Sequence, residues 1–154
     1  LVGEGRIIFN NGYLLSVLFE GSTDWSGAAS QQLWVDSIMI DLSNGQVLTA
    51  ENLFQLEIPT DWKEVLAEKS YGLLMERLGS EMVWNEGLLP TEENFSNMLV
   101  TQPGLLIIFD QYQVAAGVAG TPTVIIPWLE IAAIINPQSR ISELVIAGGS
   151  LEAN

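Results

Sequence analysis

The chain contains no cysteine and no histidine. It therefore cannot form disulfides, use a thiol nucleophile, build the usual zinc sites or run acid–base chemistry on an imidazole. Basic residues are scarce too: five lysines and arginines stand against 19 aspartates and glutamates, a net charge of −14. Nucleic-acid binding needs basic side chains to neutralise phosphates, so the composition argues against it. An anionic membrane surface would also repel the chain.

Long apolar runs are missing as well. The two longest, over residues 105–109 and 123–135, fall short of the roughly 18 residues that a membrane span needs, so we expect no membrane insertion. Yet 48% of residues are hydrophobic and only 16% charged, against about 25% charged in an average globular protein. At 154 residues the chain fits a single domain over 1–154. We expect its excess apolar surface to be covered by a second copy, as a homodimer, or by a separate N-terminal segment.

The first half of the sequence predicts β structure. Apolar runs over 5–9 and 12–20 flank an Asn-Gly pair, and a third run over 30–42 is followed by a second such pair. Asn-Gly between apolar runs is a strong signal for a tight hairpin. These runs predict a three-stranded meander. The alternation of the third run breaks near Ser37, which predicts a bulge or a change of face there.

A helix is predicted over about 61–78. Pro59 ends the preceding segment, Thr60 or Asp61 can cap the first turn, and Gly79 can end the last one. Apolar residues recur at helical spacing and predict one buried stripe, which includes Trp62, Val65, Leu66 and Leu73.

Three further strands are predicted over 97–101, 105–109 and 123–127, then a short helix over 128–135 and a last strand over 143–147. Strands, a helix and strands again indicate an α+β fold, a mostly antiparallel sheet with one main helix on one face. The expected core comprises Ile7, Phe9, Leu15, Val17, Trp34 or Val35, Leu53, Phe54, Leu66, Leu73, Leu106, Ile108, Val124 and Ile126.

Three stretches carry a resemblance to a known family: "SIMIDLSNGQVLTAENLF", "PTEENFSNMLVTQPGLLIIFDQYQVA" and "AGTPTVIIPWLEI". In order and spacing they resemble the DUF3298 domain of bacterial proteins, over roughly residues 12–135. That domain occurs in lysozyme-sensing anti-sigma factors and beside cell-wall deacetylases. The resemblance implies an extracytoplasmic location, whether secreted, periplasmic or membrane-anchored, although the chain carries no signal-peptide pattern. It also implies that the domain recognises a protein, with basic lysozyme-type enzymes as the precedent.

The chain departs from the family pattern in three places. Family members often carry a Gly-Gly-Ala-His-Gly-like motif where this chain has "SGAAS", with Ala29 in place of the histidine. Ala116 and Gly117 replace a common Pro-Tyr pair, and Trp128 replaces a tyrosine. Members usually begin with a strand and a helix before the position of Leu1, so we expect this domain to lack both elements.

Three residues are candidates for an interaction site. Asp110 and Tyr112 directly follow a core strand, where the end of a sheet could present them to a ligand. The alternative is that the Asp110 carboxylate accepts backbone N–H groups in a turn and Tyr112 packs with its hydroxyl at the surface. Trp25 lies in the polar stretch "STDWSGAAS" and could anchor an interface or stack on a sugar, unless it folds back on the core.

No catalytic or metal motif stands out. The stretch "DLSNGQVLTAEN" lacks the glycine and glutamate positions of a calcium loop, and a serine nucleophile would have no histidine beside it. We therefore expect no metal, no cofactor and no catalysis. The sequence favours a non-enzymatic extracytoplasmic recognition or sensing module that binds a basic protein. The alternatives are an accessory glycan-binding domain of a cell-wall protein and an enzyme of unrecognised type.

Overall fold

A four-stranded antiparallel sheet forms the first half of the chain. The computed structural model describes residues 2–24 and 31–152. The strands lie in chain order: β1 (Val2–Asn10), β2 (Leu14–Thr23), β3 (Gln32–Asp41) and the two-residue β4 (Gln46–Val47). At the first hairpin the Asn10 and Asn11 side chains accept N–H groups of Gly12 and Leu14, and Gly12 adopts a φ of 86°. The predicted meander is confirmed, and β4 extends it.

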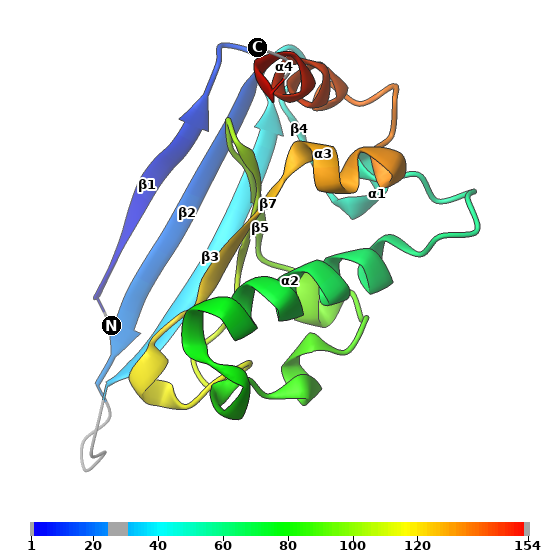
Figure 1. Ribbon diagram of the computed structural model, residues 1–154. Helices are drawn as coiled ribbons and strands as arrows, with labels where there is room; N and C mark the ends of the chain where they lie inside the picture. Colours follow the sequence, from blue (N-terminus) through cyan, green and yellow to red (C-terminus); the bar gives the residue numbers. More distant parts are fainter. Residues whose placement is uncertain (1, 25–30, 153–154) are drawn as a thin grey trace.

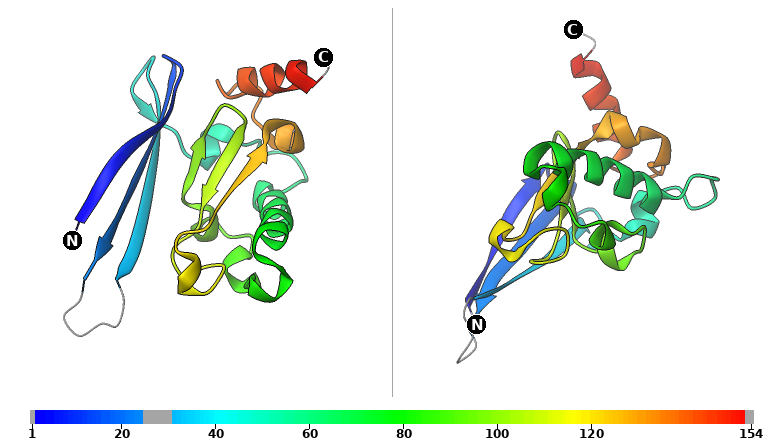
Figure 2. Two further views of the ribbon diagram at one scale, coloured as in Figure 1. Left: turned by 60° about the vertical axis from the view of Figure 1, so that its left-hand side comes forward. Right: turned by 60° about the horizontal axis from the view of Figure 1, so that its bottom comes forward.

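A second, three-stranded antiparallel sheet follows in the order β5 (Met98–Val100), β6 (Gly104–Ile108) and β7 (Thr123–Pro127). It lies between the first sheet and helix α2 (Trp62–Leu78), as the left view of Figure 2 shows. The Ser16 hydroxyl joins the two sheets by donating to the Val100 carbonyl at 2.8 Å. The α+β class is therefore confirmed, with the strands divided between two sheets.

Helix α2 has the caps that its sequence predicts. The Asp61 side chain accepts from the Lys63 N–H at 2.9 Å, and the helix ends at Gly79 with a φ of 88°. Trp62 and Leu66 are buried. The predicted Val65 and Leu73 are partly buried against the core, because the buried stripe runs on through Ser70 and Leu74.

Short helices connect and finish the fold (Figure 1). They are α1 (Ala50–Leu53), α3 (Trp128–Ile131), α4 (Ser142–Glu152) and the 3-10 turns η1 (Ser80–Met82), η2 (Asn85–Leu88), η3 (Glu93–Phe95), η4 (Gly117–Ala119) and η5 (Ala132–Ile134). The short helix predicted over 128–135 is thus present as α3 and η5. None of the helices in the described ranges is long and apolar enough to cross a membrane.

The last predicted strand, over 143–147, is wrong, because this stretch forms part of helix α4. Its short apolar run fits either a strand or one face of a helix. Ile141 and Leu144 are both buried, with Val145 partly buried beside them. That spacing of three and four residues places all three side chains on one side of a helix that packs near α3.

The expected core is wrong for one part of the first sheet. Leu14 and Leu18 are buried, whereas Ile7, paired with Val17 on the opposite face, is 62% exposed. Leu15 lies on that outer face too and is only half-buried. Both faces of β2 are apolar, and a strand's alternation alone does not say which face is covered.

The predicted bulge lies in a different strand. The pairing of β2 with β3 is regular past Ser37, while the register of β1 against β2 shifts between Ile7 and Phe9. This shift brings Phe9 opposite Ser16, where it is partly buried against the core. Most of the other residues expected in the core are covered. The fully buried ones are Leu53, Phe54, Ile108, Val124 and Ile126. Val35 and Leu106 are partly buried against the core, and Trp34 is half-buried on the outer face.

Candidate functional site

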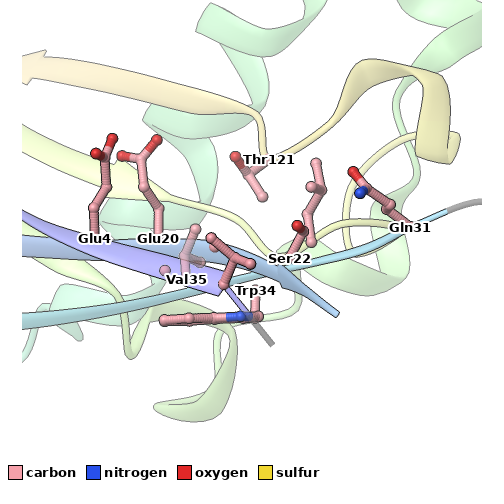
Figure 3. A pocket seen from close by; sticks show the side chains of 11 residues that line it. Glu4, Glu20, Ser22, Gln31, Trp34, Val35 and Thr121 are labelled. Carbon is pink, nitrogen blue, oxygen red and sulfur yellow. The ribbon is translucent and has the colours of Figure 1, made fainter. Parts of the chain in front are cut away.

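An acidic cleft of about 370 Å³ opens at the end of the first sheet that lies near Thr121 (Figure 3). Glu4 and Glu20 are directly opposite each other on β1 and β2. Figure 3 shows both carboxylates on the same face of the sheet, with the Trp34 ring on the other face. Ser22, Gln31, Leu33 and Val35 complete much of the lining. The cleft thus combines two carboxylates with short polar groups and an apolar floor.

Two glycines at this end of the first sheet allow the Trp34 ring to lie close to the backbone. A Cβ atom at Gly3 or at Gly21 would overlap the Trp34 ring, which lies across both strands. Only glycine permits so close an approach of a ring to the backbone. The ring therefore supports the cleft from behind.

The two glutamates differ in their partners. Glu20 accepts from the Arg6 guanidinium at 2.8 Å, in a pair that is largely exposed to solvent. Glu4 has no ion-pair or hydrogen-bond partner among the described residues. Because one guanidinium faces two carboxylates and contacts only Glu20, Arg6 neutralises the cleft only in part.

The loop over 110–122 borders the cleft. The Gln111 side chain accepts from the Leu33 N–H at 2.9 Å and donates to the Gly117 carbonyl at 3.4 Å. In this way one amide side chain ties the loop to the edge of β3. Thr121, at the end of the loop, lines the cleft.

Asp110 lies in this loop but does not line the cleft. Its carboxylate was one candidate for accepting backbone N–H groups, but here the Gln113 side chain accepts from the Asp110 N–H at 2.9 Å. Desolvation raises the pKa of Asp110, and the nearby negative charge of Asp36 raises it further. The two aspartates are therefore close enough to repel each other.

Tyr112 is held in an uncommon backbone conformation, with a φ of 69°. Its ring packs against Gly117, where any side chain would overlap it, and the residue is 55% exposed. Tyr112 therefore packs on Gly117 at the surface and lies outside the lining of the cleft. Trp25 lies outside the described residues.

Sequence reasoning missed Glu4 and Glu20. Counting back from the tight turn pairs Asn10 with Leu15, and without a bulge the same count would pair Glu4 with Gly21. The bulge between Ile7 and Phe9 moves the register by one residue and brings Glu4 opposite Glu20. A register shift of this kind leaves no clear mark in a single sequence.

The cleft has acceptors for a cation. Within the described ranges, no group of three or more acidic side chains is placed to hold a metal ion. The chain has no histidine or cysteine to act as base or nucleophile. Its carboxylates suit lysine and arginine side chains, which they bind by charge-assisted hydrogen bonds.

Comparisons with known proteins agree on one family. The model of the family described as "Protein of unknown function (DUF3298)" matches residues 51–129. A solved DUF3298 member from Bacteroides fragilis is similar over 94% of this chain and 57% of its own, with a TM-score of 0.75 at 19% identity. A solved family protein from Pseudomonas aeruginosa is similar over 88% of this chain and 61% of its own, with a TM-score of 0.62 at 16% identity.

These identities show a shared fold, and the chain spans about three fifths of the length of either solved protein. No curated protein matches the chain. The family match covers just over half of the 154 residues and includes α2, all three strands of the second sheet and the loop beside the cleft. This chain is a member of the DUF3298 family.

Proposed function

We propose that this domain is a non-enzymatic extracytoplasmic recognition module that binds a basic protein through its acidic cleft. The main support for this proposal is that the basic side chains of the domain are already bound to other groups of the domain. Arg6, Lys63, Lys69 and Arg140 are each in an ion pair with an acidic residue of the domain. Arg77 donates to the Thr123 carbonyl. Most of the 19 acidic residues are therefore left to attract a cation from outside.

The electrostatics of the cleft support the same partner. Glu4 and Glu20 lie directly opposite each other, with both carboxylates on the same face of the sheet. A lysine or arginine of a partner could bind both carboxylates by charge-assisted hydrogen bonds. The net charge of −14 would also steer a basic protein toward the domain from a distance.

Family resemblance supports the location and the class of partner. Lysozyme-type enzymes are basic, and the family includes sensors of lysozyme. A cleft with paired carboxylates and no nucleophile or imidazole is better suited to binding than to catalysis. We therefore assign recognition, and no reaction, to this domain.

The test uses calorimetry to measure the binding of a lysozyme to the purified chain, at low and at high salt. We expect binding at low salt that weakens steeply as salt rises, because exposed charges are screened beyond about 10 Å at 0.1 M salt. The double variant Glu4→Gln, Glu20→Gln should bind at least about tenfold more weakly. Glu143→Gln, on α4, removes one exposed carboxylate outside the cleft and is the matched control. Binding that ignores both salt and the double variant would refute the proposal.

A further inference from the structure

A second and larger hollow, of about 730 Å³, lies along β3 away from the acidic cleft. Its lining includes Ser37 and Met39 of β3, the segment 47–51 that follows β4, and the start of α2. We propose that this groove binds an extended segment of a protein partner as an added strand on β3, and that the segment carries alternating apolar and basic side chains. The inference rests on the proposed function for the basic character of the partner, and it deepens that function by adding a docking surface.

The edge of β3 is open along most of its length. β3 has ten residues, but β4 pairs only with Ile40 and Asp41. Three bonds show which backbone groups point away from β2: the Leu33 N–H to Gln111, the Ser37 N–H to Asp36, and the Met39 carbonyl to the Leu48 N–H. Groups of the same parity point the same way. The N–H and carbonyl of Val35 and the carbonyl of Ser37 therefore face the open edge.

The groove begins where β4 stops. The Leu48 N–H bond to Met39 is the last backbone bond between the two segments, at 2.8 Å. Thr49 then starts helix α1 through a capping box with Asn52, which turns the chain away from β3. A segment that continued the line of β4 would run along Ser37 and Val35 up to the Gln111 side chain.

The groove offers apolar contacts to alternate side chains of such a strand. Met39, Trp62, Phe95 and Met98 belong to its lining but are nearly covered by the core, so the accessible apolar surface comes from exposed side chains such as Val47. Leu56 stands on its wall and is 58% exposed. Strand addition takes affinity from main-chain bonds and specificity from such side-chain contacts.

The rim of the groove selects for basic residues. Glu51, Glu92 and Glu93 line it, are exposed and have no ion-pair partner among the described residues. Lys63 is the cation in the lining, and it is held by Asp61 at 3.4 Å and by the Trp62 ring at 5.2 Å. A second copy of this chain would bring more negative charge to the rim, so charge complementarity favours a basic partner.

The open edge of β3 is only weakly protected against pairing with another strand. The Asp36 carboxylate accepts from the Ser37 N–H at 2.8 Å in an exposed position, and charged groups on an edge strand discourage unspecific pairing. Exchanging this solvent-exposed hydrogen bond for a main-chain hydrogen bond to the partner costs little free energy. A partner that brings a lysine can also engage the released carboxylate.

The test uses the blocked peptide Lys-Val-Lys-Val-Lys-Val-Lys, titrated into the isotope-labelled chain and followed by NMR. We expect the amide signal of Ser37, which lines the groove and not the cleft, to shift. The same peptide with alternate N-methylated amides should bind at least about tenfold more weakly, because it cannot donate to the edge. Glu92→Lys with Glu93→Lys should weaken binding by a similar factor. Glu64→Lys with Glu68→Lys, two exposed residues of α2 outside the groove, makes the same change in net charge, is the matched control and should bind as the unchanged chain does.

The outcomes separate this inference from the proposed function. Three results would each overturn the proposed strand addition at the groove. They are signal shifts confined to the cleft around Glu4 and Glu20, equal binding of the methylated peptide, and no binding of the peptide. If lysozyme still binds in a cleft-dependent way in those cases, the proposed function stands without it. If the peptide binds at the groove while lysozyme does not bind at all, the groove stands and the cleft assignment fails.

Discussion

At the scale of single residues, the loop beside the cleft is shaped by glutamine more than by the aspartate and tyrosine that stand out in the sequence. Gln111 holds β3, and Gln113 caps Asp110 and also donates to the Gly87 and Asn94 carbonyls at 3.0 Å. Glutamine side chains have no strong positional signal in a sequence. Their role here follows only from the contacts that the fold creates.

Asp110 provides a test at this scale. Desolvation first, and then the charge of Asp36, raise its pKa above the ordinary 3.8. A raised pKa means that the folded state binds the proton more tightly than the unfolded state, so its favourable contribution is complete below pH 3.8 and is lost as the pH rises through the folded pKa. At neutral pH the ionised carboxylate therefore opposes folding.

We expect Asp110→Asn to raise the melting temperature at neutral pH and to leave it nearly unchanged below pH 3.8. Thermal unfolding followed by circular dichroism over a pH series checks this. Asp24→Asn, at an exposed carboxylate near the end of β2, controls for the change in net charge. A lower melting temperature for Asp110→Asn at neutral pH would show that the ionised carboxylate has a favourable role.

At the scale of elements, local signals predicted most of the fold. Asn-Gly turns marked the hairpins, and Asp61 and Gly79 marked the ends of α2, because capping and positive φ act through neighbouring atoms. The predictions failed where the outcome depends on distant packing. The covered face of β2, the bulge in β1 and the helical state of α4 are set by the second sheet and by α3. The cleft was missed for the same reason.

Helix α2 offers the clearest test of packing. Leu66 is fully buried on the face that meets the core. We expect Leu66→Ala to lower the free energy of unfolding by about 2–5 kcal/mol, from lost burial and the cavity left behind. Leu56→Ala, at a largely exposed position, should change it by less than about 0.5 kcal/mol. Urea unfolding measures both, and equal stabilities for the two variants would mean that α2 packs through another face.

At the scale of the whole molecule, charge and apolar surface are separated. The outer face of the first sheet carries Ile7, Phe19 and Val47 as exposed apolar side chains. Asp36 is the acidic residue that the described strand registers place on that face. Contiguous apolar patches beyond a few hundred Å² are rare on monomers, so this face fits the expectation that another chain or segment covers it.

We expect the chain in isolation to self-associate through this outer face. Light scattering over a range of micromolar concentrations should give a mass above the 16.8 kDa of one chain. Ile7→Thr with Phe19→Thr keeps strand-forming side chains while removing apolar surface, and should return the mass to that of a monomer. Added salt should strengthen the association by screening the net charge of −14. A monomeric mass for the unchanged chain at every concentration would contradict this expectation.

We propose above that this domain recognises a basic protein by charge at the cleft of Glu4 and Glu20. The most direct measurement is the affinity for a lysozyme at several salt concentrations, for the unchanged chain and for Glu4→Gln with Glu20→Gln. We expect the affinity to fall steeply with salt for the unchanged chain, and the double variant to bind at least about tenfold more weakly with a shallower dependence on salt. Absence of binding at low salt, or equal affinity of the two chains at every salt concentration, would contradict it.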